Sequence, residues 1–418
     1  MDYIKNLKNN IVVNRKHLGW TQEMLAEKLG ITFQAVSKWE NGLSSPDISM
    51  LPVLSQLFGI SMDELFGMSS PHALTSEPLE ISWPDDNTIR IAVFSGKKLL
   101  TATEEQEKIT VKLENEPENV VCYCNLECEI INGAASANGN LSCGNYIGEN
   151  ASAGGHLSCL NINGCASAGA DLKCDSINGP AAAGTTLKCG GDINGSASAG
   201  ATLCCGGDIN GNASANSSLT CDGDIIGSAE AGTDLQCGGD ISGGASASGN
   251  LTCEGDIDGS AQAGTDLQCG GDISGDASAG KSLTCEGDIG GNAEAGADLQ
   301  CGGDISGDAS AGKSLTCEGD IDGNAQAGAD LQCGGDISGD ASASENLTCE
   351  GSIGGNAQAG ADIQCGGDIL GDASADGSIT CEGNIEGNAQ AGADIQCGGD
   401  INGEVSCHGN ITEEGDIS

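Results

Sequence analysis

Aromatic residues are scarce in this chain of 418 residues, at 2% of the total, and none follows Tyr146. Glycine, by contrast, occurs 68 times. A compact core needs bulky side chains to fill it, so an ordinary globular fold is excluded for the last part of the chain. That part is either disordered or built around a very thin core.

Basic residues are also few, with 15 lysines and arginines against 61 acidic residues and a net charge of −46. The shortage is uneven. Residues 1–67 hold six basic and seven acidic residues, whereas from residue 121 onward there are four lysines, no arginine and 44 acidic residues. Such an excess of negative charge repels DNA phosphate and anionic membranes. Any contact with nucleic acid must therefore come from the N-terminal part.

Long apolar runs are missing as well. No segment approaches the ~20 apolar residues of a membrane-spanning helix, and no signal peptide precedes the first expected helix. We therefore expect a cytoplasmic protein with no membrane association. The 23 cysteines would suggest disulfides in a secreted protein, but in the cytoplasm we expect reduced thiols.

Residues 3–67 contain five segments with the apolar spacing of short helices. The first covers residues 3–18, and the third directs Val36 and Trp39 inward. The other boundaries fall at residues typical of helix starts and ends, namely Thr21, Gly30, Thr32, Gly42, Asp47 and Ser61. Two short helices joined at Gly30-Ile31 have the arrangement that places the second helix in a DNA major groove. This segment is expected to be an all-α, five-helix head.

The order of residues in the head is more specific than the helix pattern. It contains, in sequence, the runs Thr21-Gln22-Glu23-Met24-Leu25-Ala26, Gly30-Ile31-Thr32, Gln34-Ala35-Val36-Ser37-Lys38-Trp39-Glu40-Asn41-Gly42 and Pro46-Asp47. In this order the runs closely resemble the Cro/repressor-type (XRE) helix-turn-helix family. The resemblance covers residues 3–67, about a sixth of the chain.

The resemblance implies double-stranded DNA as the partner. Gln22, at the start of the second helix, would contact phosphate, because a helix N-terminus favours an anion. On the third helix, Gln34 would bond adenine, Lys38 would reach guanine and Phe33 would touch a thymine methyl group, although Phe33 replaces the polar residue common there. The expected DNA-contacting residues are Gln22, Thr32, Phe33, Gln34, Ser37, Lys38, Asn41 and Ser44. The family pattern also implies that Arg15 and Glu40 pair with each other, so Arg15 is not expected to bind DNA.

From Cys128 to Cys397 the chain repeats every 16 residues, with three 15-residue units near the start. Each unit has the form Leu-x-Cys-x-Gly-x-Ile-x-Gly-x-Ala-x-Ala, and alternation with period two marks strands with one buried face. Repetition at a fixed length indicates identical rungs stacked in register. We expect an all-β parallel β-solenoid with one rung per 16-residue turn. A glycine-rich disordered tail is the alternative, but disorder would not hold aliphatic residues in one phase over successive units.

The Gly-Asp-Ile-x-Gly rungs resemble those of the bactofilins, polymer-forming cytoskeletal proteins built as β-solenoids. Bactofilin rungs rely more on valine and isoleucine and are not rich in cysteine. Before the repeats, residues 88–94 and 108–113 alternate apolar and polar side chains and predict two strands. With Trp83 and Phe94, they suggest a cap over the first rung. The expected domains are a head at 1–67, a linker at 68–80, a β connector or cap at 81–120 and the solenoid at 121–418.

The repeats contain two chemically distinctive columns of side chains. Eighteen cysteines occupy an inward position, where a small buried hydrophobe suits a narrow core. Pairwise oxidation and soft-metal binding are the alternatives, without the Cys-x-x-Cys spacing that favours zinc. Cys165 and Cys204 fall at outward positions and are better candidates for reactive thiols. The aspartates three residues after the cysteines would repel one another unless they bind turn amides, counterions or Ca²⁺.

No nucleophile–base pair or phosphate-binding loop is recognisable, and we expect no enzyme, no cofactor and no metal. The sequence predicts a DNA-binding transcriptional regulator whose acidic solenoid serves assembly, sensing or docking of a protein partner. One recognition helix reads only a few base pairs, so we expect a homo-oligomer that presents two heads. The alternatives are a bactofilin-like scaffold tethered to DNA by its head, and a rod that mimics DNA and binds a basic protein.

Overall fold

The computed structural model describes residues 3–60, 62–67, 88–91, 94–95, 98–99 and 109–413. The chain divides into two units, residues 1–84 and 85–418, and each has its own hydrophobic core. The linker predicted at residues 68–80 and the side chain of Trp83 lie outside the described residues. In the described ranges, no helix has the length and apolar character needed to cross a bilayer.

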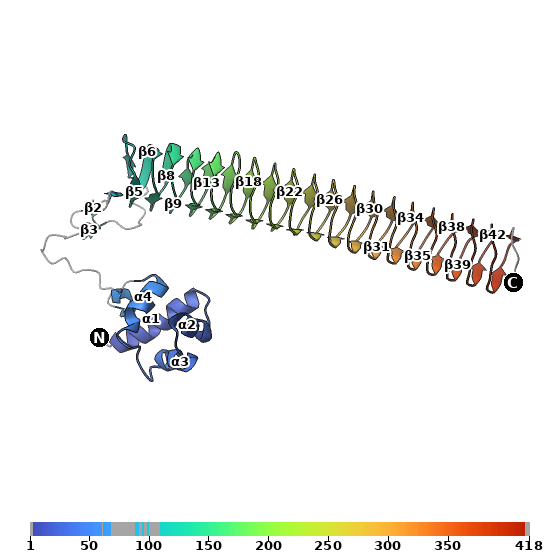
Figure 1. Cartoon of the computed structure of the whole chain (residues 1–418), viewed down its shortest axis with the longest axis horizontal. Helices are drawn as coiled ribbons and strands as arrows, with labels where there is room; N and C mark the ends of the chain where they lie inside the picture. The colour runs from blue at the N-terminus through green and yellow to red at the C-terminus, as the bar shows by residue number, and fades with distance from the viewer. Residues whose placement is uncertain are drawn as a thin grey trace. The chain divides into compact units, whose positions relative to one another are not determined.

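The first unit contains the predicted helical head (Figure 1). Its helices are α1 (Tyr3–His17), α2 (Gln22–Leu29), α3 (Phe33–Asn41), α4 (Met50–Phe58) and α5 (Met62–Leu65). Each of the first four contributes a side chain that is fully or almost fully buried, among them Ile11, Leu25, Val36 and Leu54. Trp39 is 7% exposed, which confirms its predicted place in the core. The all-α head is therefore confirmed.

The helix starts follow the sequence signals in part. The hydroxyl of Thr21 accepts a hydrogen bond from the Met24 N–H at 3.2 Å, and Gly30 ends α2 in the left-handed conformation with φ 67°, both as predicted. Thr32 precedes α3, but its hydroxyl makes no capping hydrogen bond, so the predicted side-chain cap is wrong. The carbonyl of Thr32 instead accepts the N–H of Ala35 at 3.0 Å, which starts the helix through the backbone alone.

The fourth helix begins at Met50, three residues later than the start predicted at Asp47. The Asp47 carboxylate accepts the Ser49 N–H at 3.0 Å, and its carbonyl accepts the Met50 N–H at 2.8 Å. Asp47 therefore organises a turn that leads into the helix. Ser61, expected to start the fifth helix, lies outside the described residues.

The second unit is a parallel β-solenoid with three columns of strands (Figure 1). The Ala-x-Ala column consists of β5 (Asn119–Cys122), β7 (Ala135–Ala137), β9 (Ala151–Ala153), β12 (Ala166–Ala168), the odd-numbered strands from β15 (Ala181–Ala183) to β41 (Ala389–Ala391), and β43 (Val405–Cys407). The Leu-x-Cys column consists of β6 (Asn125–Ile131), β8 (Leu141–Ile147), β10 (Leu157–Ser158), β13 (Leu172–Cys174), the even-numbered strands from β16 (Leu187–Cys189) to β42 (Ile395–Cys397), and β44 (Ile411–Glu413). The third column contains β11 (Asn161–Ile162), β14 (Ser176–Ile177) and isoleucine bridges onward to Ile401.

From β16 onward each rung lies in register with the next, one repeat further along the chain, whereas the pairing of β6 with β8 shifts register between Cys128 and Ile130. Leu251 pairs with Leu267 and Cys253 with Cys269 in the Leu-x-Cys column. Ile257 pairs with Ile273 in the isoleucine column. The parallel solenoid with about 16 residues per turn is therefore confirmed.

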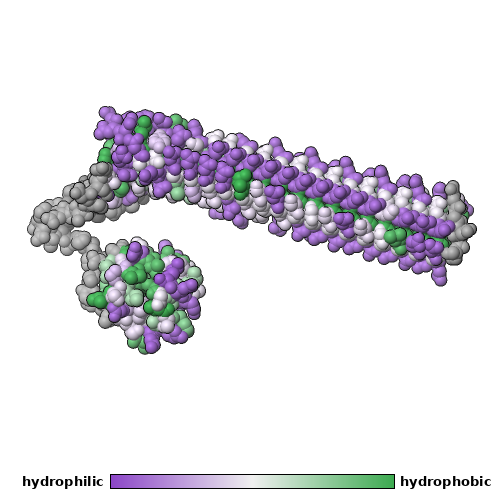
Figure 2. Space-filling model, in the orientation of Figure 1, coloured by the Kyte–Doolittle hydropathy of each residue, from purple (hydrophilic) through white to green (hydrophobic). Residues whose placement is uncertain are grey.

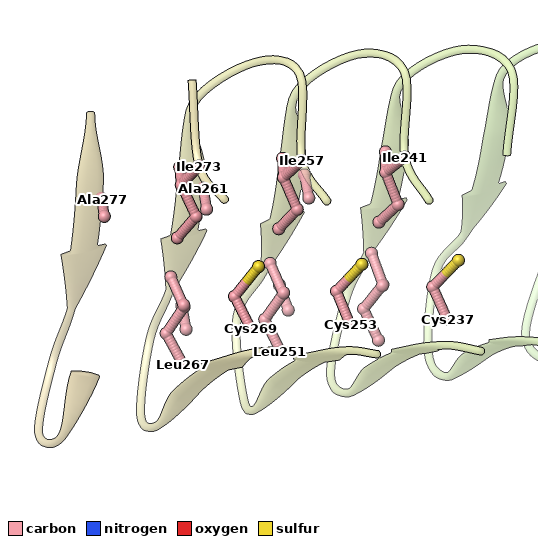
Figure 3. Packing of buried hydrophobic residues seen from close by; sticks show 14 of the residues in the cluster. Cys237, Ile241, Leu251, Cys253, Ile257, Ala261, Leu267, Cys269, Ile273 and Ala277 are labelled. Carbon is pink, nitrogen blue, oxygen red and sulfur yellow. The ribbon is translucent and has the colours of Figure 1, made fainter. Parts of the chain in front are cut away.

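The solenoid core is a thin stack of like side chains (Figure 3). Leu251, Cys253, Ile257 and Ala261 are each at most 1% exposed. The thiol of Cys253 donates to the carbonyl oxygen of Gly239 in the preceding rung at 3.2 Å, and the column cysteines from Cys189 to Cys397 repeat this contact. The cysteine therefore fills space and also supplies a donor to a turn carbonyl inside the core.

The connector strands lie in the same columns as the repeats. Strand β1 (Thr88–Ile91) pairs in parallel with β5, and β4 (Thr110–Lys112) pairs in parallel with β6. Between them, β2 (Phe94–Ser95) and β3 (Lys98–Leu99) form an antiparallel pair. Both predicted segments thus contain strand, and they precede the first cysteine-containing rung.

Carboxylates at the corners bind the backbone of the following rung. Oδ1 of Asp288 accepts the N–H of Asp304 at 2.8 Å, and Oδ1 of Asp304 accepts the N–H of Asp320 at 2.8 Å. A Cβ atom on Gly319 would collide with Oδ1 of Asp304, which explains the glycine before each such aspartate. Of the partners considered for these aspartates, the turn amides are the ones observed. Similar bonds join Asn292, Asp308 and Asn324 at a second corner.

Candidate nucleic-acid interface

Helices α2 and α3 meet at the short turn through Gly30 and Ile31, and the two sides of α3 differ sharply. Val36 and Trp39 face the core, with 0% and 7% exposure. Phe33, Gln34 and Lys38 lie on the other side and are exposed to solvent. This separation gives α3 one face for packing and one face for a ligand.

The sequence-predicted residues divide into one group on α3 and several around it. Residues three or four positions apart share a helix face, so Gln34, Ser37, Lys38 and Asn41 form one row along α3. Ser37 is half-buried and the others are exposed. The Asn41 side-chain amide donates to the Ser37 carbonyl at 2.9 Å, which ties the end of this row to the helix backbone.

The remaining predicted residues lie at the two ends of α3 and on α2. Thr32 and Phe33 stand at its start, where Phe33 is 44% exposed. Ser44 follows its end and is exposed, with its N–H donating to the Lys38 carbonyl at 3.4 Å. Gln22 is half-buried at the first position of α2.

A buried ion pair joins α1 to α3. Nε and Nη2 of Arg15 donate to the two carboxylate oxygens of Glu40 at 2.6 and 2.9 Å, and Nη1 donates to the Trp20 carbonyl at 2.6 Å. The side chains of Arg15 and Glu40 are only 10% and 5% exposed. The pairing implied by the family pattern is present, and it uses the Arg15 guanidinium inside the head.

Glu40 has a further partner that the sequence analysis missed. Nε2 of Gln22 donates to Oε2 of Glu40 at 2.7 Å. One amide hydrogen of Gln22 is therefore directed at Glu40, and the amide has a second hydrogen with which to donate. No local pattern reveals this contact, because the two residues are 18 positions apart.

The charges in this network reinforce one another. Burial opposes ionisation of Glu40, but hydrogen bonds from Arg15 and Gln22 outweigh it and hold the pKa of Glu40 below its ordinary value. The hydrogen bond with Glu40 raises the pKa of Arg15. Glu40 thus remains a carboxylate that fixes Gln22 at the N-terminus of α2.

The described residues contain no group of three or more histidine, cysteine or acidic side chains arranged to hold a metal ion. In the head, Lys28 lies over the ring of Trp20 with its ammonium 4.8 Å from the ring centroid. Lys28 is thus partly engaged within the head, whereas Lys38 extends from the exposed face of α3.

Residues 14–65 match the helix-turn-helix family model, and with the geometry above they define the head as a helix-turn-helix domain of the Cro/repressor type. The chain is 44% identical over 45 residues to the HTH-type transcriptional activator BcrR of Enterococcus faecalis, which is 11% of this chain and 22% of that protein. It is 39% identical over 59 residues to the SPbeta prophage-derived uncharacterized HTH-type transcriptional regulator YonR of Bacillus subtilis, which is 14% of this chain and 53% of that protein.

An uncharacterized HTH-type transcriptional regulator of Sinorhizobium medicae is 38% identical over 58 residues, covering 14% of this chain and 42% of that protein. The chain thus spans from about a fifth to about half of the length of these relatives. No solved structure matches the chain. The relatives share the class of DNA-binding domain found in the head.

Proposed function

We propose that the head binds a specific DNA sequence through α3 and that the protein regulates transcription. The observation behind this proposal is the row of polar side chains on the exposed face of α3, opposite the buried Val36 and Trp39. Glutamine can pair with adenine and lysine with guanine in a major groove, so Gln34 and Lys38 are the proposed base-reading residues. The relatives named above are HTH-type transcriptional regulators, which supports the same class of function.

Alanine substitutions on α3 test this proposal. Gln34→Ala and Lys38→Ala should each weaken binding at the preferred site by ~1–3 kcal/mol and relax the sequence preference. Gln22→Ala should weaken binding to all sequences alike, because the contact proposed for Gln22 is with phosphate, which carries no sequence information. Gln56→Ala and Lys16→Ala are matched controls, since both side chains are exposed and lie on other helices. Unchanged affinity in both α3 variants would exclude the assigned interface.

Two heads are needed to read two half-sites, so we propose a homo-oligomer in the cytoplasm, without enzymatic activity. In this proposal the head comprises residues 1–67, and residues 81–120 cap the solenoid. The solenoid provides the arm for assembly, sensing or docking of a protein partner.

A basic protein is a second candidate partner, and the charge of the solenoid supports it. Between Cys221 and Cys397 there are 32 acidic residues and two lysines. At ~4.8 Å per rung, this is about one net negative charge per 1.8 Å, close to the ~1.7 Å of B-DNA. Binding of a labelled lysine-rich peptide should fall steeply with salt, as it does for DNA. Salt-independent binding, or none, would exclude this partner.

The bactofilin resemblance suggests an alternative to a transcriptional regulator, namely a structural scaffold that its head tethers to DNA. Its supporting observation is the stack of rungs in constant register from β16 onward, which is the architecture that the resemblance implies. Negative-stain microscopy of the full chain separates the two proposals. Short discrete particles favour the regulator, and long filaments favour the scaffold.

A further inference from the structure

One outward column of the solenoid alternates two residue types without exception. In the middle position of the Leu-x-Cys strands, threonine and glutamine follow each other in register from Thr220 to Thr412. The glutamines are exposed, and the threonines up to Thr380 are half-buried between them. Between Thr220 and Thr412 the column contains no charge, in a solenoid that is otherwise strongly acidic.

A second column beside it alternates in the opposite sense. The residue after the cysteine is glycine on the glutamine rungs, as at Gly270, and acidic on the threonine rungs, with Asp222 on the first and glutamate from Glu254 to Glu382. The glycine is required by the backbone, because a Cβ atom at Gly302 would collide with the carbonyl oxygen of Glu286. Long side chains and notches therefore form a checkerboard that repeats every second rung, or about 9.6 Å.

This checkerboard has no function within the chain that its contacts reveal. Among the described residues, none of these threonine or glutamine side chains forms a hydrogen bond. The outward residue after the isoleucine follows the two-rung repeat less strictly, since serine recurs on the glutamine rungs from Ser242 to Ser338 but is replaced by Leu370 further on. The middle residue of the Ala-x-Ala strands also alternates, with serine on every second rung from Ser214 to Ser406, so duplication of a two-rung unit accounts for alternation in a single column. The Leu-x-Cys face differs in that its two adjacent columns alternate in opposite phase.

We propose that this checkerboard face binds the same face of a second copy of the chain, with the two solenoids side by side and parallel. A two-fold axis parallel to the solenoid axis places each rung opposite the same rung of the second copy. The threonine and glutamine column of one copy then faces the glycine and glutamate column of the other. Gln268 then lies over the notch at Gly270 of the other copy. Glu286 lies opposite Thr284 of the other copy, whose hydroxyl can donate to the carboxylate.

The antiparallel pairing is less favourable. It would place each glutamate opposite a glycine, which offers no side-chain donor. It would also bring the carboxylates of the two copies within one rung of each other, where like charges repel. The parallel arrangement therefore gives every long side chain a complementary site.

The face is large enough for a stable dimer. Eleven rungs at ~4.8 Å and a width of about five residues at ~3.3 Å give roughly 800 Å² per copy, the usual size of a specific interface. The acidic corners oppose association, and their repulsion falls as salt shortens the Debye length. The dimer should therefore strengthen as salt rises, which distinguishes it from association through ion pairs. If the proposed DNA binding is correct, the joined N-terminal ends of the solenoids would also suit two half-sites.

Sedimentation of the full chain without DNA tests the interface. The wild-type chain should sediment as a dimer at micromolar concentration, more completely at ~0.5 M than at ~0.05 M salt. Filling three notches with Thr284→Gln, Thr316→Gln and Thr348→Gln should weaken dimerisation at least about tenfold. The matched control is Ser278→Gln, Ser310→Gln and Ser342→Gln, which makes the same change on the Ala-x-Ala face. A wild-type monomer at every salt concentration, or equal weakening in both triple variants, would overturn the proposal.

Cys204 tests the orientation, because it lies in the same column and pairs in register with Thr220. In a Cys165→Ser background, a short bismaleimide should join Cys204 of one copy to Cys204 of the other, and Cys204→Ser should abolish this product. A dimer that yields no Cys204–Cys204 crosslink would refute the parallel arrangement. Both measurements are made without DNA, so a negative result leaves the proposed DNA binding standing.

Discussion

Replacing aspartates in the corner column separates two opposing effects, hydrogen bonding and charge repulsion. Asp240, Asp272 and Asp304 each have an aspartate on the rung before and on the rung after. Each carboxylate accepts an N–H from the next rung, at 2.9, 2.8 and 2.8 Å for the three. Asparagine keeps this acceptor and removes the charge, whereas alanine removes both.

The geometry sets the magnitude of each effect. Two unit charges ~4.8 Å apart in water repel by about 0.9 kcal/mol, or about 0.5 kcal/mol after screening at physiological salt. With two neighbours per site, the triple asparagine variant should therefore be more stable by about 3 kcal/mol. Asn384 already occupies this column and accepts the Asp400 N–H at 2.9 Å, so asparagine fits. Alanine loses a charged hydrogen bond worth about 1.5–3 kcal/mol per site, which exceeds the gain from relieved repulsion.

Urea unfolding followed by far-UV circular dichroism measures the result. The midpoint of the solenoid transition should rise in the triple asparagine variant and fall in the triple alanine variant. The rise should shrink in ~1 M salt, where the Debye length is about 3 Å. Destabilisation by asparagine as large as that by alanine, or a shift that ignores salt, would refute the assigned balance.

Three further outcomes follow from single side chains. Glu40→Gln should lower the free energy of unfolding of the head by about 3–5 kcal/mol, since it leaves a buried guanidinium without its counter-charge. The pKa of Glu40 is lowered in the folded head, so its contribution to the free energy of unfolding is present above about pH 4.3 and is lost as pH falls through the folded pKa. The variant should therefore lack this part of the acid dependence of unfolding, which tryptophan fluorescence measures. Native alkylation with mass spectrometry should label Cys165 and Cys204 before Cys205, because the hydrogen bond with Cys189 and burial raise the pKa of Cys205 to about 11. Equal labelling rates would contradict the inward and outward assignment. Gly319→Ala should lower the solenoid midpoint through its collision at the corner, and an unchanged midpoint would show that the corner has room.

The sequence predicts the repeats more fully than the head contacts. The positions of Leu251, Cys253, Ile257 and Ala261 are all separated by even numbers, so one assumption about strands places every inward side chain. Repetition then fixes the register, because any slip would bring unlike residues together. The partner of the corner aspartates was not predictable in the same way. Whether an aspartate binds a turn amide depends on where the N–H of the next rung lies, and only the folded structure determines that position.

Within the head, local signals succeed where the interaction is local. Thr21 caps the helix that begins at the next residue by accepting the N–H of Met24, three positions on, and its type and position suffice to predict that bond. Thr32 has the same type and position, yet its hydroxyl makes no such bond, since a side-chain rotamer is not determined by the sequence pattern. The contact from Gln22 to Glu40 joins two helices and required the fold itself.

Selection of DNA from a random-sequence pool by the full chain tests the central claim most directly. The exposed row on α3 predicts that one sequence motif is enriched, and that Gln34→Ala or Lys38→Ala changes or abolishes the enrichment. An unenriched pool, or the same motif recovered by wild type and by both variants, would contradict sequence-specific DNA recognition through α3.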